Sequence, residues 1–250
     1  MKASFRSRLK HGETLLGTLV TLSSPEVAEI LAEAGFDWLF IDMEHSPLDV
    51  REAQAILQAV GERCACVLRV PLNDEIWIKK ALDIGATGII IPQVNSRQEA
   101  ERAVRFCKYP PQGSRGVGVA RAQGYGARLQ DYLDSANDDV AVIVQAEHID
   151  GVSRIQEIVS VAGVDAVLVG PYDLSASMGK IGNVTDAEVQ AAIARVKGEC
   201  TSTHVPIGIF AATAEAAKPF MHEGYSLIAV VIDTLFLVEA ANQLVRQLRE

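Results

Sequence analysis

The sequence has few of the residues that build thiolate metal sites or disulfide scaffolds. It has four cysteines and five histidines in 250 residues, and no two cysteines form a C-x-x-C pair. This excludes a zinc ribbon and a thioredoxin motif. Cys64 and Cys66 lie in an apolar run, where they are expected to act as small hydrophobic residues. The spacing favours reduced thiols and a cytoplasmic protein.

A basic surface and a long apolar span are also missing. The formal net charge is −9, which argues against binding to a phosphate backbone. The apolar segment 225–241 is interrupted by Asp233, so no stretch qualifies as a membrane span. With 49% hydrophobic and 22% charged residues, the chain is expected to fold around a core. We therefore expect no nucleic-acid partner and no membrane partner.

Short runs rich in valine and isoleucine alternate with amphipathic segments. Ser24 with Pro25, and Thr185 with Glu188, are typical of helix starts. The apolar runs predict eight strands, each followed by a helix, at residues 15–22, 36–43, 64–71, 86–94, 140–147, 164–171, 206–212 and 226–233. Strands that are apolar throughout are typical of parallel sheets. This predicts an α/β fold, a (β/α)8 TIM barrel forming a single domain over residues 1–250. A doubly wound open sheet is the alternative.

The alternation pauses at residues 109–138, which are dense in glycine. This segment is expected to be a long loop with a short helix, and loops of this length are often functional.

Polar residues follow several predicted strands, where a barrel collects its active groups. Because Glu147 and Asp173 follow neighbouring strands, their carboxylates are expected to converge. Two such carboxylates repel each other unless a cation or a shared proton lies between them. Oxygen ligands favour Mg²⁺ or Mn²⁺. The alternative is that each carboxylate pairs with a loop arginine, Arg115 or Arg121.

Arg69 ends an apolar strand, so its guanidinium is expected to face the barrel mouth and bind a carboxylate or enolate oxygen. The alternative is a salt bridge to Glu44 or Asp42. His45 lies three residues after Asp42, which favours a base oriented by that carboxylate. A surface histidine is the alternative reading.

Other chemistries lack their residues. None of the eight lysines lies inside a predicted strand, which argues against a Schiff-base aldolase. No G-x-S-x-G elbow and no phosphate-binding G-x-x-x-x-G-K-[ST] loop occurs.

The runs FDWLFIDMEHSP, GIIIPQV, YPPQGSRGVG, VIVQAE and VDAVLVGPYDLSASMG together resemble the HpcH/HpaI family of metal-dependent pyruvate aldolases. The likeness extends from Gly17 to the last strand. Its D-x-x-H, Q-x-E and G-P-x-D-L-S motifs are short, but in combination they are highly specific. The resemblance implies a carbon–carbon lyase that cleaves 4-hydroxy-2-oxo acids to pyruvate, or a related 2-oxo acid, and an aldehyde. It also implies a barrel that assembles into a homohexamer, a trimer of dimers, whose terminal helix packs on a neighbour.

Site roles follow from the same resemblance. It implies that Glu147 and Asp173 bind the divalent cation, which is Mg²⁺, Mn²⁺ or Co²⁺. Gln145 and the backbone at Tyr172–Asp173 match contacts to the pyruvate end of the substrate. The catalytic set it implies is Arg69 for the enolate, His45 as base, Asp42 as the partner of that histidine, and Asp83 as an acid that raises its basicity.

One position departs from the pattern, because many family members have alanine where Tyr172 stands. Substrate choice is therefore open. A related lyase that acts on an acyl-CoA ester or decarboxylates a 2-oxo diacid is the main alternative, although a net charge of −9 suggests no basic groove for CoA. A non-catalytic barrel would not explain the cluster of Glu147, Asp173, Arg69 and His45.

Overall fold

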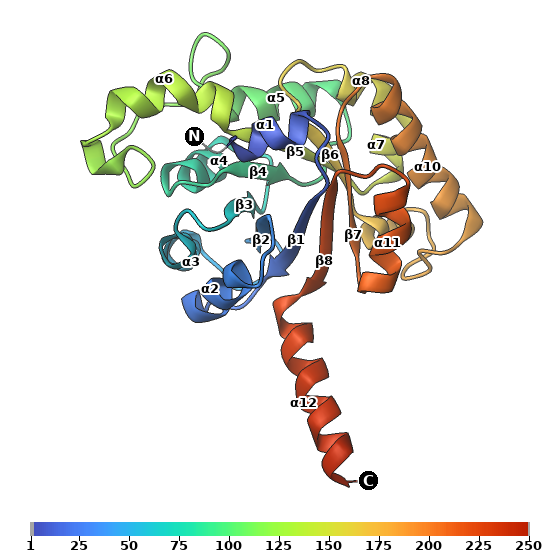
Figure 1. The fold of residues 1–250 in the computed structure, drawn as a ribbon. Coiled ribbons are helices and arrows are strands. Elements are labelled where there is room, and N and C mark those ends of the chain that lie inside the picture. The colour runs from blue at the N-terminus through green and yellow to red at the C-terminus, as the bar shows by residue number, and fades with distance from the viewer. Residues whose placement is uncertain (1–2, 250) are drawn as a thin grey trace.

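The computed structural model describes residues 3–249, which form a closed barrel of eight parallel strands (Figure 1). Each strand pairs with the next, and β8 pairs with β1. This confirms the expected eight-stranded parallel barrel with helices between the strands and excludes the open sheet. The strands are β1 Leu15–Val20, β2 Trp38–Asp42, β3 Ala65–Arg69, β4 Gly88–Ile91, β5 Ala141–Ala146, β6 Ala166–Val169, β7 Ile207–Ala211 and β8 Leu227–Ile232.

Helices connect the strands and cover the outside of the barrel. They are α1 Phe5–Lys10, α2 Pro25–Glu33, α3 Val50–Val60, α4 Glu75–Asp83, α5 Arg97–Cys107, η1 Gly124–Gly126, α6 Leu129–Asp139, α7 Ile149–Ser153, α8 Ile155–Val159, α9 Pro171–Ser177, α10 Ala187–Ser202, α11 Ala214–His222 and α12 Asp233–Arg249. None of the helices within residues 3–249 is long and apolar enough to span a bilayer.

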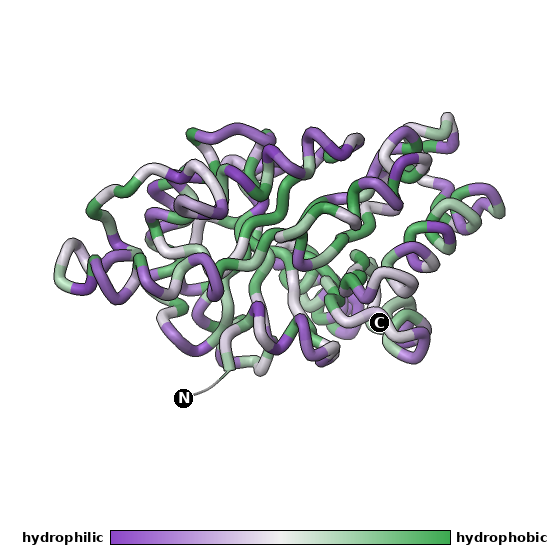
Figure 2. The backbone as a smooth tube through the Cα atoms, turned by 90° about the horizontal axis from the view of Figure 1, so that it is seen from above, coloured by the Kyte–Doolittle hydropathy of each residue, from purple (hydrophilic) through white to green (hydrophobic). Residues whose placement is uncertain are grey.

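Two apolar layers hold the barrel. Side chains such as Trp38, Phe40 and Leu168 fill its interior, and a larger cluster lies between the strands and the helices. Figure 2 shows the corresponding apolar strands running through the centre of the molecule. Gly17 has no side chain because the Trp38 ring occupies that space, and a Cβ there would lie 2.4 Å from it.

The two ends of the barrel differ. Helix α1 covers the end at which the strands begin, and its Phe5 lies against Trp38. At the other end α12 leaves the barrel and points away from it (Figure 1). Asp233 anchors the start of α12 by accepting hydrogen bonds from the backbone N–H groups of Thr21 and Leu22, each at 2.8 Å.

Candidate active site

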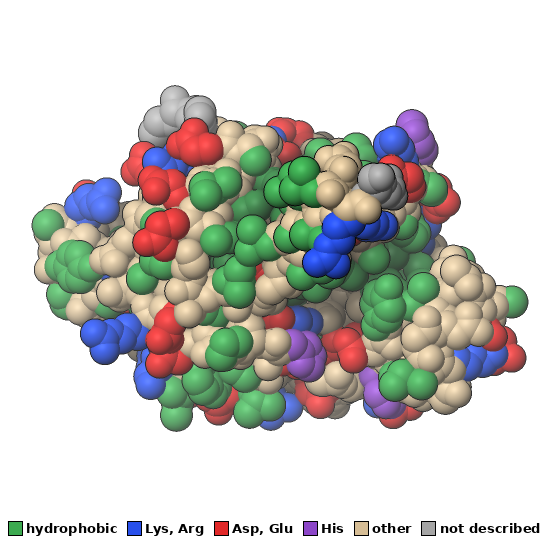
Figure 3. Space-filling view, turned by 90° about the horizontal axis from the view of Figure 1, so that it is seen from below, with side chains coloured by type: hydrophobic (Ala, Val, Ile, Leu, Met, Phe, Trp, Pro, Cys, Tyr) green, Lys and Arg blue, Asp and Glu red, His purple; other side chains and the backbone are tan. Residues whose placement is uncertain are grey.

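All of the predicted site residues except Asp83 gather where β2, β3, β5 and β6 end. Asp42 and Arg69 are register partners on β2 and β3, and Gln145 lies on β5. Glu147 follows β5 directly, and Asp173 lies in the first turn of α9 after β6. Figure 3 looks at the molecule from the end that α12 leaves.

Arg69 and Asp42 form a buried bidentate pair. Arg69 Nε donates to Asp42 Oδ1 at 2.9 Å, and Nη2 donates to Oδ2 at 2.7 Å. Burial raises the pKa of Asp42, but the hydrogen bonds and charge of Arg69, together with the backbone N–H groups of Glu44 and His45, outweigh it, and the pKa falls below its usual range. The salt bridge weighed as an alternative therefore exists. It leaves Nη1, which is 3.5 Å from Gln145 Oε1, as the nitrogen with the most freedom to bind a substrate oxygen.

Glu147 is fixed from two sides. Its Oε1 accepts a 2.8 Å hydrogen bond from the backbone N–H of Gln93, and its Oε2 accepts one from the Gln145 amide. Gln93 has a φ of 53°, a strained conformation for a residue other than glycine. Gly170 leaves room for this arrangement, because a Cβ there would lie 3.3 Å from Glu147 Oε2.

Glu44 is a member of the cluster to which the sequence assigned no role beyond pairing with Arg69. Its Oε2 lies 3.2 Å from Arg69 Nε, but that N–H is directed at Asp42. Within residues 3–249, this buried oxygen has no hydrogen-bond partner. The sequence signal that could have identified Glu44 is its place in the D-x-E-H run, two residues after Asp42.

Burial raises the pKa of Glu44 and of Glu147 to about 7. The charge of Asp173 contributes to both increases in pKa, so this carboxylate lies close to the other two. Three acidic groups at one barrel mouth, two of them held partly protonated, form a site that favours a cation.

His45 differs from its prediction. Its side chain is 62% exposed, and its Nε2 lies 3.8 Å from Glu44 Oε2. Asp42 accepts a hydrogen bond from the backbone N–H of His45, at 3.3 Å, rather than from the ring. The expected orientation of the imidazole by Asp42 is therefore wrong, because Arg69 and two backbone N–H groups use that carboxylate. Glu44 is the carboxylate that faces the ring.

Asp83 does not join this cluster. It ends α4, where the chain turns back toward the beginning of β4, so it lies at the opposite end of the barrel from His45. Its Oδ1 accepts a 2.9 Å hydrogen bond from Arg115. Within one chain, Asp83 therefore cannot raise the basicity of His45.

The loop arginines are also committed elsewhere. Arg115 pairs with Asp83, and Arg121 donates to the carbonyls of Ile84 and Leu57 at 2.8 and 3.0 Å. The alternative in which these arginines neutralise Glu147 and Asp173 is wrong.

The donor set fits a hard divalent cation that keeps open positions. No group of three His, Cys, Asp or Glu side chains with metal-binding geometry occurs in the described part of the chain. Two carboxylates, Glu147 and Asp173, remain, and such a site leaves room for waters and substrate oxygens. The orphaned oxygen of Glu44 faces the same cluster and would accept from a water bound there.

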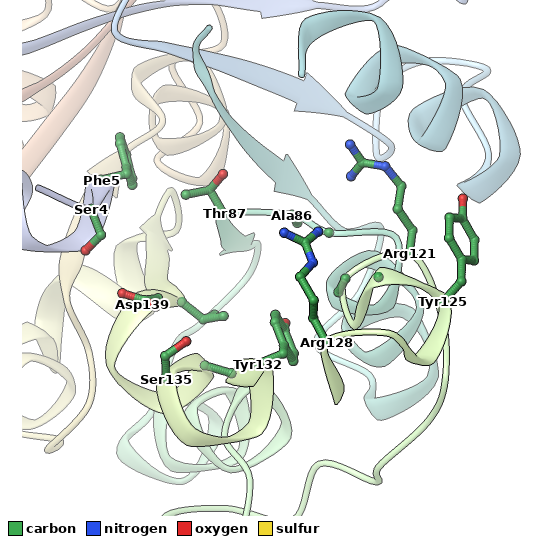
Figure 4. Close-up of a pocket in the computed structure, with 15 residues that line it drawn as sticks. Ser4, Phe5, Ala86, Thr87, Arg121, Tyr125, Arg128, Tyr132, Ser135 and Asp139 are labelled. Atoms are coloured by element: carbon green, nitrogen blue, oxygen red, sulfur yellow. The ribbon is translucent and has the colours of Figure 1, made fainter. Parts of the chain in front are cut away.

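A cavity of about 220 Å³ lies over these groups. Its polar wall includes Asp42, Arg69, Gln145 and Asp173, and its apolar wall includes Phe210. A larger cavity, of about 500 Å³, lies at the other end of the barrel (Figure 4). There Arg128 extends into the space beside Thr87 and Tyr132, but no acidic pair faces it.

Residues 16–240 match the family model described as HpcH/HpaI aldolase/citrate lyase. The chain belongs to this family. The hydroxypyruvate/pyruvate aldolase of Paraburkholderia phytofirmans is 40% identical, with 98% of this chain and 96% of that one covered. An Escherichia coli 4-hydroxy-2-oxo-heptane-1,7-dioate aldolase is 42% identical, with 98% and 94% covered. A Burkholderia cenocepacia HpcH/HpaI family structure matches with a TM-score of 0.95 and 39% identity over 98% of each chain.

The expected family is thus confirmed, and with it the enzyme class, a carbon–carbon lyase. Membership in the HpcH/HpaI family also agrees with the acidic, cation-favouring cluster at the barrel mouth.

The metal-free protein is expected to lose stability as pH rises from about 5 to about 8. Folding raises the pKa of Glu44 and Glu147 from 4.5 to about 7, so the folded state holds protons that the unfolded state releases in this range. Melting temperatures measured in EDTA across the range test this. In Glu147→Gln the melting temperature should fall less steeply with pH. An equally steep fall in that variant would show that other groups cause the loss of stability.

Proposed function

We propose that this protein is a divalent-metal-dependent aldolase that reversibly cleaves 4-hydroxy-2-oxo acids to pyruvate, or a related 2-oxo acid, and an aldehyde. The meeting of Arg69, Gln145 and Asp173 on one pocket, with Glu147 bonded to Gln145 behind its wall, supports this most strongly. The curated relatives are named as aldolases, including a 2-dehydro-3,6-dideoxy-6-sulfogluconate aldolase from Pseudomonas putida at 40% identity.

Glu147 and Asp173 would hold the cation, Mg²⁺, Mn²⁺ or Co²⁺. When bound, it supplies Lewis-acid polarisation of the substrate keto group. Gln145 and the backbone at Tyr172–Asp173 bind the pyruvate end of the substrate.

The remaining residues act on the proton and the developing charge. His45 accepts the proton of the C4 hydroxyl, and the C3–C4 bond breaks to release the aldehyde. The electron pair of that bond forms the enolate of pyruvate, whose oxygen is stabilised by Arg69 Nη1. Glu44, whose Oε2 lies 3.8 Å from His45 Nε2, stabilises the protonated ring, an effect that the family resemblance assigns to Asp83.

The decisive experiment measures pyruvate release from a panel of 4-hydroxy-2-oxo acids, with and without Mg²⁺. Malyl-CoA, citramalyl-CoA and oxaloacetate are assayed in parallel. The proposal requires metal-dependent release from the hydroxy-oxo acids and much slower turnover of the others. Turnover of the CoA esters alone would favour the lyase alternative, and loss of CO₂ alone would favour decarboxylation. No turnover of any substrate would favour a non-catalytic barrel.

We also propose that residues 1–250 form one domain and that the protein assembles as a homohexamer, a trimer of dimers. Helix α12 supports assembly because its apolar side chains are exposed, among them Leu237, Leu244 and Leu248 at 56%, 57% and 77%. Figure 3 shows apolar side chains along this projecting helix. A large exposed apolar face of this kind is typical of a surface that binds another protein chain.

The loop beside Asp83 supports the same proposal. Val117 and Val119 are 61% and 65% exposed there. In the proposed assembly a neighbouring copy covers these valines and supplies the His45 that Asp83 of the same chain cannot reach.

Leu244→Asp is expected to break the assembly, because it places a charge in the apolar face of α12. Sedimentation velocity should show species smaller than the wild-type oligomer. Gln243→Asp, on the same helix, is the matched control and should leave the oligomer intact. A wild-type mass equal to one chain would overturn the proposed assembly.

The cytoplasm is the proposed compartment. All four cysteines are free and buried, and burial raises the pKa of the Cys107 thiol to about 12. Such thiols are typical of proteins from reducing compartments.

A further inference from the structure

A second hollow lies beside the catalytic pocket. This side pocket, of about 200 Å³, lies between β7 and helices α10 and α11. It is lined mainly by apolar side chains, including Val184, Ile193, Ile209, Ala216 and Phe220. Pro171, Tyr172 and Phe210 line both this pocket and the catalytic one, so these three residues form the wall between them.

The wall is closed by one aromatic contact. The rings of Tyr172 and Phe210 are 6.4 Å apart and tilted by 56°. Tyr172 is 47% exposed, and none of the side-chain hydrogen bonds among residues 3–249 involves its hydroxyl group. A ring that is half exposed and makes no side-chain hydrogen bond can change rotamer at a modest cost.

The orientation of the substrate follows from the proposed function, on which this inference rests. The carboxylate and keto oxygens of a 2-oxo acid must face the polar wall, where Arg69, Gln145 and Asp173 lie. C3 is then the carbon that can face the apolar wall. A substituent on C3 would meet the Tyr172–Phe210 pair first and the side pocket behind it.

We propose that the side pocket is a subsite for an alkyl substituent on C3 of the 2-oxo acid, and that Tyr172 is its gate. The substrate class therefore includes straight-chain 2-oxo acids longer than pyruvate, such as 2-oxobutanoate and 2-oxopentanoate. Tyr172 controls specificity through its ring, while its backbone remains at the site.

Exchange of C3 protons for deuterium, followed by NMR in D₂O, tests the subsite without an aldehyde. A base removes a C3 proton, the C–H electron pair forms the C2–C3 double bond, and the keto electron pair moves to oxygen. Return of a deuteron from solvent restores the 2-oxo acid. The measured quantity is the ratio of exchange rates of 2-oxopentanoate and pyruvate, with Mg²⁺ present.

Ala216→Leu places a larger apolar side chain at the exposed rim of the side pocket and is expected to lower this ratio about tenfold, the usual discrimination for a lost methylene site. Pyruvate exchange should stay at the wild-type rate. Ala214→Leu, the same change at an exposed position of α11 that does not line the pocket, is the control. Tyr172→Ala opens the gate and should raise the ratio about tenfold, and Ala216→Leu in that background should cancel the gain.

The outcomes separate the two proposals. Pyruvate exchange with a ratio that Ala216→Leu and Tyr172→Ala leave unchanged would overturn the subsite and retain the aldolase. Absence of pyruvate exchange in the wild-type protein with Mg²⁺ or Mn²⁺ would overturn the proposed function itself. Should Tyr172→Ala fail to fold, Ala216→Leu decides alone, because it adds an apolar side chain at a helix position outside the catalytic pocket.

Discussion

EDTA is expected to reduce cleavage of 4-hydroxy-2-oxo acids by at least about 10³-fold, and added Mg²⁺ or Mn²⁺ should restore it. A divalent cation that polarises the keto group lowers the activation barrier by several kcal/mol. Each 1.36 kcal/mol corresponds to a tenfold change in rate. In the structure Glu147 and Asp173 supply carboxylates, and no strand lysine offers an amine route. Full activity after exhaustive chelation would contradict the metal-dependent mechanism.

Two variants separate the cation from the proton transfer. Glu147→Gln removes a charged ligand and should weaken Mn²⁺ binding in calorimetry, with partial rescue of cleavage by excess Mn²⁺. His45→Ala should impair cleavage with nearly unchanged Mn²⁺ affinity, because its ring is 62% exposed and follows β2, whereas Glu147 follows β5 and Asp173 follows β6. Equal loss of Mn²⁺ from both variants would show that His45 is a ligand or a structural support.

Borohydride reduction tests whether a lysine forms a Schiff base with pyruvate. Borohydride with pyruvate should leave the protein unlabelled, since a Schiff base needs a desolvated lysine amine. Lys108 is the buried lysine with the most perturbed amine, as burial lowers its pKa to about 8. However, its Nζ donates to the carbonyls of Asn137 and Val140, far from the site. Labelling of any lysine would overturn this part of the mechanism.

The barrel could be predicted because its strands are apolar throughout. Runs such as GIII on β4 are buried on both faces, and only parallel sheets require this eight times in succession. The strand ends then locate the site: Asp42 and Arg69 end neighbouring strands, and parallel register brings them opposite each other.

Local competition explains the errors at helix starts. Thr185 was expected to begin α10, but Asp186 is the N-cap and accepts a hydrogen bond from the backbone N–H of Glu188 at 2.9 Å. Both residue types cap helices well, so the pattern alone cannot choose between neighbours. Helix α9 was not predicted because Pro171–Ser177 is only seven residues long and buries only Pro171, Leu174 and Ser175.

Side-chain partners could not be read from spacing. Asp42 lies three residues before His45, yet it pairs with Arg69 from another strand, because a guanidinium offers two parallel donors and an imidazole only one. The family resemblance assigned Asp83 a catalytic role. In the folded chain, however, Asp83 pairs with Arg115 at the end of the barrel opposite the site.

Arg69→Ala is expected to lower kcat by about 10²–10³-fold, the usual effect of removing one donor to a developing oxyanion. The same variant leaves Asp42 buried without its partner, which costs about 3–5 kcal/mol of stability. Arg69→Lys is therefore the companion variant. It keeps a positive charge beside Asp42 and Glu44, but a single ammonium cannot both hold Asp42 and reach the position of Nη1 near Gln145.

The two variants together distinguish catalysis from support. If Arg69 stabilises the enolate, Arg69→Lys should retain a melting temperature near that of the wild type and still lose most of kcat. Pyruvate C3 proton exchange should fall in parallel, because the same enolate forms. Mn²⁺ affinity should change little, since Glu147 is held by Gln93 and Gln145 rather than by Arg69. Normal kcat and exchange in Arg69→Lys, with a lower melting temperature, would reduce Arg69 to a structural partner of Asp42.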